Sequence, residues 1–203
     1  MENKPWMIAL MIAVAAYITK LWYDDYVAAR RQQPNPRGLP GAVPAPSGAI
    51  IVAVLGAWVL LAAETWGELA LGVAEKQTKI TWLFAIYTLL AGVIEEIIFR
   101  GYLVIEKRGR AMLWAGIVGA SLLFAALHPF LWRWKDGALS FDFGTKGWFS
   151  TLVVFGSSLW FYCVRFARNN PAHSLLPCFA AHVGKNLGVI VVKLSQGYLA
   201  GFW

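Results

Sequence analysis

Six polar side chains interrupt segments that are otherwise almost entirely apolar. They form three groups along the chain, namely Glu95, Glu96 and Arg100, then His128, then His182 and Asn186. An ionisable residue in a membrane-length apolar segment costs about 2.5–3.5 kcal/mol to insert, so such residues usually serve a function. Carboxylates, imidazoles and carboxamides are the groups that activate water, move protons or stabilise an oxyanion. We therefore expect these residues to form a catalytic or transport site.

The spacing of the first group separates the roles of its two acids. Glu96 and Arg100 are four residues apart with the acid first, which is the favoured order for an ion pair within one helix. Glu95 is rotated by about 100° from Glu96 and cannot share that pair equally. We expect Glu95 to be the free carboxylate, suited to act as a general base. For Glu96 and Arg100 alone, a purely structural clamp between helices is an equally open interpretation.

The second and third groups supply imidazoles and an amide. His182 and Asn186 are four residues apart, so they project from one helical face and can both donate to a single oxyanion. His128 can hold an attacking water together with Glu95, or ligate a metal. Two histidines and a glutamate would suit zinc, but Asn186 would then lose its partner in the oxyanion site. Metal-free chemistry is preferred slightly, and zinc remains the one cofactor left open.

The elements that must position these groups are membrane-spanning helices. Of the 203 residues, 59% are hydrophobic and 14% charged, a composition typical of membrane proteins. Six apolar stretches approach the roughly 20 residues that cross a bilayer: 6–22, 49–63, 80–105, 111–128, 148–166 and 175–194. The first ends in an interfacial anchor around Trp22, which favours a retained helix over a signal peptide. We predict an all-α polytopic bundle of about six spans with an intramembrane polar cavity.

The connecting segments complete this plan. We expect a single membrane domain over 1–203, a core over 80–194 that carries the polar groups, and a Pro-rich loop over 24–47. Residues 64–79 should form an interfacial helix or loop, and 130–147 a loop at the headgroup level. Ser121 and Ser158 are interpreted as helix-packing positions, and Lys185 is expected to reach a lipid headgroup.

The net charge of +7 comes from short basic clusters between apolar runs. This pattern indicates topology control and contact with anionic lipid, and it argues against nucleic acid as a partner. The odd-numbered connectors carry a slight excess of basic residues, which favours their cytoplasmic placement in a multi-pass protein of the cell membrane.

The polar groups also carry a resemblance to a known family. The run from Glu95-Glu96 to Arg100 resembles the Glu-Glu-x-x-x-Arg motif of the CPBP family, which includes the type II CAAX prenyl proteases (Rce1-like) and bacteriocin-processing and self-immunity proteins. Phe124-x-x-x-His128 resembles its second motif and His182-x-x-x-Asn186 its third. All three occur in the family's order, over about half of the chain.

This resemblance implies an all-helical membrane protease with a cavity that opens to the cytosolic side. By motif, Glu95 activates water and His128 assists it, while His182 and Asn186 stabilise the oxyanion. The second acid and the arginine of the first motif hold it in shape. The substrate would be a peptide or protein, with or without a lipid group, cleaved near its C-terminus. Family members are often called metalloproteases, although the same residues can work without a metal.

Two other functions compete with proteolysis. One is a non-catalytic binding or self-immunity protein that uses the same cavity to hold a peptide. The other is a small proton-coupled transporter, because acids and histidines also form proton relays. Transport ranks last, since the sequence has no inverted repeat.

Overall fold

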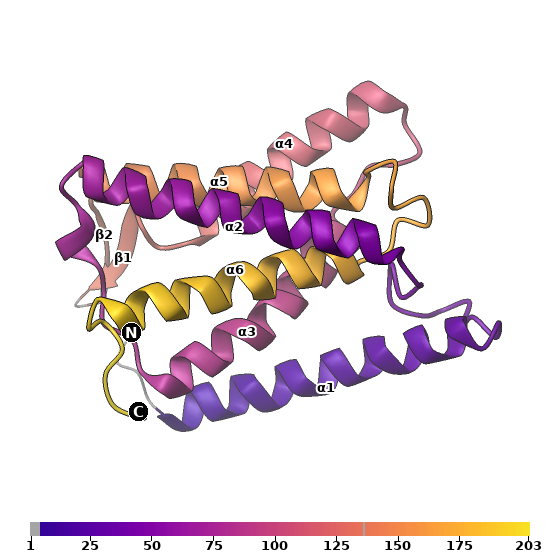
Figure 1. Ribbon diagram of the computed structural model, residues 1–203, viewed down its shortest axis with the longest axis horizontal. Helices are drawn as coiled ribbons and strands as arrows, with labels where there is room; N and C mark the ends of the chain where they lie inside the picture. Colours follow the sequence, from indigo (N-terminus) through magenta and orange to yellow (C-terminus); the bar gives the residue numbers. More distant parts are fainter. Residues whose placement is uncertain (1–4, 136) are drawn as a thin grey trace.

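The computed structural model describes residues 5–135 and 137–203. Within these residues six helices are long and apolar enough to cross a membrane, so the predicted all-α polytopic bundle is confirmed. The helices are α1 (Pro5–Arg30), α2 (Ser47–Ala70), α3 (Trp82–Glu96), α4 (Arg110–Leu127), α5 (Thr145–Arg165) and α6 (Leu176–Ser195) (Figure 1).

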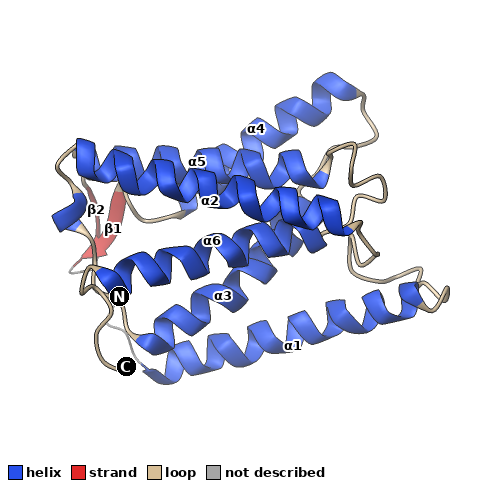
Figure 2. Cartoon of the chain, in the orientation of Figure 1, coloured by secondary structure: helices blue, strands red, loops and turns tan. Residues whose placement is uncertain are grey.

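Two smaller elements lie in the connections. A 3-10 turn, η1 (Ala74–Lys76), follows α2, and a hairpin of β1 (Trp132–Lys135) and β2 (Ala138–Phe141) follows α4 (Figure 2). The strands are antiparallel, with Trp132 opposite Phe141. The sequence interpretation had only a loop here, although the aromatic–basic alternation of β1 has the period of a strand. The structure therefore corrects that interpretation.

The helix boundaries differ from the sequence interpretation at two places. Helix α1 continues to Arg30, so the Pro-rich loop begins at Arg31 and not at Asp24. Its first proline is Pro34, and nothing before it prevents helix formation. Helix α2 likewise continues to Ala70, so the segment expected to form an interfacial helix or loop begins as the last turns of α2.

The six helices run so that the α1–α2, α3–α4 and α5–α6 connections gather at one end of the molecule (Figure 1). We call this the loop end. Helix α2 packs on α6 and α5, while α3 lies between α1 and α6. Small residues on one face of α2, Ala49, Ala53 and Ala57, are fully buried, which lets the helix backbones approach closely.

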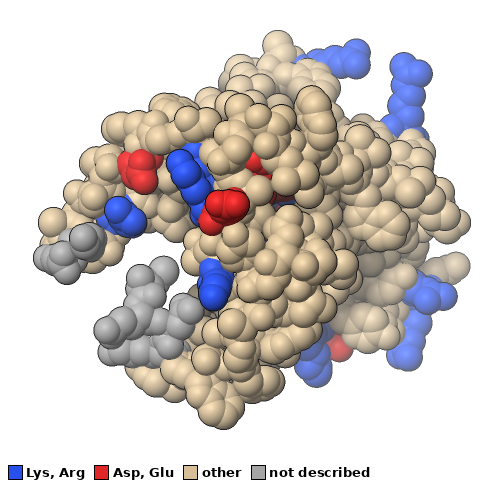
Figure 3. All heavy atoms as spheres, turned by 60° about the vertical axis from the view of Figure 1, so that its left-hand side comes forward, with Lys and Arg blue, Asp and Glu red and all other residues tan. Residues whose placement is uncertain are grey.

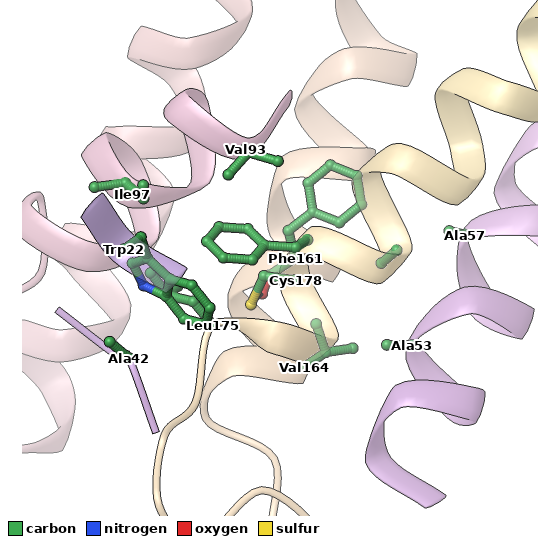
Figure 4. Packing of buried hydrophobic residues seen from close by; sticks show 12 residues of the cluster. Trp22, Ala42, Ala53, Ala57, Val93, Ile97, Phe161, Val164, Leu175 and Cys178 are labelled. Atoms are coloured by element: carbon green, nitrogen blue, oxygen red, sulfur yellow. Dashed lines mark hydrogen bonds between the residues drawn. The ribbon is translucent and has the colours of Figure 1, made fainter. Parts of the chain in front are cut away.

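The buried core lies where α1, α3, α5 and α6 meet. Trp22, Phe161, Leu175 and Cys178 pack together there, with small residues of α2 at the side (Figure 4). Outside this core, many large apolar side chains of the helices are exposed. A bilayer covers such a surface, because lipid tails are as apolar as the side chains.

The Pro-rich loop is attached to the bundle and does not hang free. Trp22 donates from its indole nitrogen to the carbonyl of Pro40, at 3.0 Å. The backbone nitrogen of Leu175 donates to the carbonyl of Gly41, also at 3.0 Å. Gly41 has φ +62°, a conformation that favours glycine. The loop therefore closes over the start of α6.

Candidate active site

Three of the predicted polar residues form a buried cluster between α3 and α6. The side chains of Glu96 and Arg100 are fully buried, and Arg100 Nη1 lies 3.2 Å from Glu96 Oε1. The predicted intrahelical pair is thus present. The same glutamate oxygen lies 2.8 Å from Nδ1 of His182. Glu96 therefore links its own helix to α6, which the spacing alone did not indicate.

The guanidinium of Arg100 makes its hydrogen bonds through Nη2, while its Nε and Nη1 have no hydrogen-bond partner among the described residues. Its Nη2 lies 2.5 Å from the hydroxyl of Ser158 and 3.1 Å from the carbonyl of the same residue. Ser158 in turn donates to Ser121, at 2.9 Å. Four aromatic rings surround the guanidinium carbon, with centroids 4.7–5.7 Å away, and they are Phe99, Phe124, Phe161 and Tyr162. Such cation–π contacts strengthen when water is excluded.

The two serines were missed as members of this cluster. The sequence interpretation treated Ser121 and Ser158 as packing positions, whereas in the structure Ser158 accepts from the buried Arg100 and donates to Ser121. A buried guanidinium needs acceptors, so small polar residues in neighbouring helices were the available signal.

Arg100 lies in a short π-helical segment, η2 (Ile97–Tyr102), that continues α3. A π segment misaligns backbone carbonyls, and such segments often occur at functional sites. The hydroxyl of Tyr162 lies 2.6 Å from the carbonyl of Phe99 and 3.2 Å from that of Leu103. Tyr162 therefore stabilises the irregular turn that carries the arginine.

Glu95 lies at the edge of the cluster and faces a pocket. Its side chain is 32% exposed, and its Oε2 lies 3.7 Å from His182 Nε2, on the opposite side of the ring from Glu96. The pocket, of about 300 Å³, lies between α1 and α3. Its lining residues are Leu10, Met11, Val14, Tyr87, Ala91, Ile94 and Glu95. Glu95 is thus the carboxylate of the pair that a molecule in this pocket can reach.

The ring of His182 is fixed by its neighbours. It stacks on Phe161, with centroids 4.8 Å apart and planes at 22°. Gly92 of α3 makes room for it, because a Cβ there would lie 3.3 Å from two carbons of the ring. Since the Glu96 carboxylate accepts from Nδ1, the other nitrogen, Nε2, is turned toward Glu95.

Asn186 lies one turn further along the same face of α6. Its Nδ2 donates to the carbonyl of Thr88, at 3.0 Å. One hydrogen of the amide is used in this contact and the second is available, because an amide nitrogen carries two. His182 and Asn186 both face α3, as their spacing predicts.

His128 lies next to this cluster but outside it. Its Nδ1 is 2.8 Å from the carbonyl of Phe124, one turn earlier in α4. The ring of Phe124 lies 4.7 Å from that of His128 and 6.3 Å from that of His182. Among the described residues His128 makes no ion pair with Glu95. The two residues expected to hold one water are therefore not in direct contact.

The same side chains bear on whether a metal ion fits this site. In the described ranges 5–135 and 137–203, no three His, Cys, Asp or Glu residues gather closely enough to hold a metal. The three residues that suggested zinc do not form such a group, and His128 contacts the carbonyl of Phe124 while His182 contacts Glu96. The arrangement does not fit a site of three protein ligands.

A second polar cluster links α2 with α5 and α6. Lys185 is buried, and its ammonium lies 2.6 Å from Glu64 Oε2. The expectation that Lys185 reaches a lipid headgroup is therefore wrong. Glu68 pairs with Lys146 and accepts from Gln77 at 2.7 Å. At the end of the molecule that comes forward in Figure 3, acidic and basic side chains lie beside one another.

Comparison with known proteins gives one result. A family model described as type II CAAX prenyl endopeptidase, Rce1-like, matches residues 77–188, more than half of the chain. The matched range contains all six predicted site residues and the segments that connect them. No curated protein and no solved structure matches the chain.

Proposed function

Since this chain belongs to the Rce1-like family of type II CAAX prenyl endopeptidases and is an integral multi-pass membrane protein, we propose that it cleaves a peptide bond near the C-terminus of its substrate. In this proposal Glu95 activates the attacking water. The observation that carries it is the pair of atoms Glu95 Oε2 and His182 Nε2, 3.7 Å apart at the edge of a pocket.

The distance between Glu95 Oε2 and His182 Nε2 allows one water oxygen to contact both atoms. It is too long for a direct hydrogen bond, yet both atoms can lie about 2.8 Å from one oxygen placed between them. Proton transfer from water requires a base at about 2.6–3.2 Å. Glu95 is partly exposed, whereas Glu96 is fully buried and already contacts both Arg100 and His182. Glu95 is therefore the acid that we assign as the base.

In the proposed reaction Glu95 takes a proton from water, and the resulting hydroxide adds to the scissile carbonyl carbon. The carbonyl oxygen becomes an oxyanion that accepts from His182 Nε2 and from the second amide hydrogen of Asn186. In this step His182 donates from Nε2, while Glu96 contacts Nδ1 on the other side of the ring. The proton held by Glu95 then passes to the leaving amine as the carbon–nitrogen bond breaks.

His128 is assigned a supporting role in this scheme. The ring of Phe124 lies beside both His128 and His182, so His128 lies within one aromatic ring of the cluster. We propose that it contacts the water once substrate is bound, because catalytic hydrogen bonds often form only in the complex.

The pocket supports an apolar substrate that reaches Glu95 from the bilayer. Six of its seven lining residues are apolar or aromatic, and α1 and α3 form its walls. We propose that it takes apolar side chains of the substrate or a lipid group attached to it. Both are more stable in such a pocket than in water.

The test is cleavage of a quenched farnesylated CAAX peptide by purified protein in detergent. Wild type should turn over, and Glu95→Gln should lose at least about 100-fold in kcat/KM, because the base is removed while the side-chain volume is kept. Wild-type turnover should also survive a strong zinc chelator. Glu106→Gln, a matched change outside the site, should retain wild-type activity.

Three outcomes would contradict parts of the proposal. Full activity of Glu95→Gln would refute the assignment of the base. A cellular phenotype that survives the loss of both Glu95 and His128 would instead favour the non-catalytic binding function. Loss of activity with chelator that added zinc restores would refute the metal-free scheme.

A further inference from the structure

Two side chains cap the end of α4, and one of them is His128. Helix α4 ends at Leu127, so its last carbonyls have no partner within the helix. Nδ1 of His128 lies 2.8 Å from the carbonyl of Phe124. The indole of Trp132, the first residue of β1, donates to the carbonyl of Ala126 at 2.7 Å. The hairpin and His128 are therefore attached to the same helix end.

The segment between these two caps also contacts the imidazole. The ring of Phe130 stacks on that of His128, with centroids 6.0 Å apart and planes at 18°. The backbone nitrogen of Phe130 donates to the carbonyl of His128, at 2.8 Å. A displacement of the hairpin must therefore disturb the contacts that hold the ring of His128.

The hairpin presents one apolar face. In its antiparallel register Trp132 lies opposite Phe141, and Trp134 lies opposite Leu139. These four side chains project to the same side of the ribbon, because side chains alternate along a strand. Trp134, Leu139 and Phe141 are 65%, 48% and 58% exposed. Arg133 projects from the other side and is exposed as well.

This apolar face continues onto α5. The ring of Phe143 stacks on that of Phe141, with centroids 5.8 Å apart, and Trp148 near the start of α5 stacks on Phe143, at 6.1 Å. One turn further along α5, Leu152 is exposed on the surface that a bilayer covers. We call the exposed group the hairpin patch, and it consists of Trp134, Leu139, Phe141, Phe143 and Trp148.

The position of the hairpin indicates what covers this patch. The hairpin lies at the end of the bundle opposite the loop end (Figure 1). Aromatic rings such as tryptophan are enriched where the headgroups meet the acyl chains. An amphipathic element binds this boundary in proportion to the apolar area that it buries there. Arg133, on the other side of the ribbon, is placed to meet lipid phosphates.

We propose that the hairpin patch binds the headgroup–acyl boundary of a phospholipid bilayer, and that this contact fixes the position of His128. The inference rests on the proposed function for the role of His128 and adds a bilayer requirement to it. The residues of the patch are positioning residues, because they act on the water through His128. A second copy of this chain is the less suitable occupant, since the patch is continuous with the lipid-facing surface of α5.

The experiment compares cleavage of the quenched peptide in phosphatidylcholine vesicles and in dodecyl maltoside. The variant Trp134→Ser/Phe141→Ser reduces the patch and leaves Phe130 and Trp132 in place. In vesicles it should lose about 10-fold in kcat, because a shift of about half an ångström in a catalytic group costs that much. In detergent, which offers no flat headgroup boundary, variant and wild type should have equal kcat.

The matched control changes two side chains of α2 that are equally exposed. Trp66 is 73% exposed and Leu69 61%, and neither belongs to the hairpin or to the end of α4. Trp66→Ser/Leu69→Ser should therefore retain wild-type kcat in both media. Trp134→Phe/Phe141→Trp, which keeps the patch aromatic, should also retain it.

A second measurement locates the hairpin without using activity. Leu139→Cys in a Cys163→Ser background carries a single fluorescent label, because Cys178 is fully buried. Nitroxides near the headgroup should quench this label strongly, and nitroxides at the end of the acyl chain should quench it weakly. Wild-type residues 134 and 141 are unchanged in this protein, so the result does not depend on the folding of the double variant.

The failures are distinguishable. A label that no lipid nitroxide quenches would refute the membrane contact, and a crosslinked dimer through position 139 would assign the patch to a second copy. Quenching together with wild-type kcat of Trp134→Ser/Phe141→Ser in vesicles would refute the coupling to His128. Equal losses in vesicles and in detergent would show that the hairpin stabilises α4 without any role for lipid. Absence of cleavage by wild type in both media would contradict the proposed function, while the label would still decide the membrane contact.

Discussion

Gly92 lies against the ring of His182, so adding one methyl group there, as in Gly92→Ala, should change activity without lowering stability. A Cβ at position 92 would lie 3.3 Å from Cδ2 and Cγ of the imidazole. Comfortable carbon–carbon contacts are about 3.5–4.0 Å, so Gly92→Ala should push the ring by about half an ångström. The ring is stacked on Phe161 behind, and it can yield only by weakening its hydrogen bond to Glu96.

The size of the effect follows from this shift. A misplacement of 1 Å in a catalytic arrangement can cost about 100-fold in rate, so half of that should cost about 10-fold, or about 1.4 kcal/mol. Stability should move the other way or not at all, because alanine in a helix interior is favoured over glycine by about 0.5–1 kcal/mol. We therefore expect kcat to fall without a fall in the unfolding temperature.

The assay is cleavage of the quenched peptide, with thermal unfolding followed by the intrinsic fluorescence of the 11 tryptophans. Gly119→Ala is the matched control, since a Cβ at this position of α4 meets nothing within 4 Å. It should retain wild-type kcat. Wild-type kcat in Gly92→Ala would refute the idea that the position of His182 limits the reaction.

Two further predictions concern the buried charges. Glu96→Gln leaves a buried Arg100 without its counter-charge, so it should lower the free energy of unfolding by about 3–5 kcal/mol and reduce kcat/KM as well; unchanged unfolding and activity would show that the pair with Glu96 is dispensable. Lys185→Met should destabilise through the unpaired Glu64, and adding Glu64→Leu should recover most of the loss. A double variant no more stable than the single one in thermal unfolding would contradict this reasoning.

The zinc hypothesis shows how far residue types alone can lead. A glutamate and two histidines on three helices suggest zinc, because these are the usual ligands of a catalytic zinc site. Their side chains do not converge in the fold, where His128 contacts the carbonyl of Phe124 and His182 contacts Glu96. The spacing of residues on separate helices does not give the directions in which their side chains point. The sequence alone therefore cannot decide between a zinc site and a metal-free site.

The sequence could predict whatever depends on one helix at a time. Apolar length predicts the six spans, because the bilayer thickness fixes how many residues cross it. The spacing of four residues predicts the contact of Glu96 with Arg100, because helical geometry places such residues together. The same rule gives the common face of His182 and Asn186.

Boundaries were less predictable, because they depend on context. Helix α1 continues through Asp24 and Asp25 to Arg30. Lys20 donates to the carboxylate of Asp24, and the backbone nitrogen of Leu39 in the loop donates to that of Asp25. Polarity alone therefore ended the predicted helix too early. The hairpin after α4 also depends on context, because β1 is a strand through its pairing with β2. The sequence of either segment alone did not indicate that pairing.

The tertiary structure alone decided which groups meet across helices. Helix packing brings Glu96 to His182, closes four aromatic rings around Arg100, and pairs Lys185 with Glu64. It also leaves Arg165 buried beneath the Pro-rich loop without a partner among the described residues. The sequence by itself determined that polar groups must meet inside a six-helix membrane bundle, because the bilayer leaves them no other favourable place. It could not determine which of them meet, because the rotation and tilt of each helix are set by packing against its neighbours.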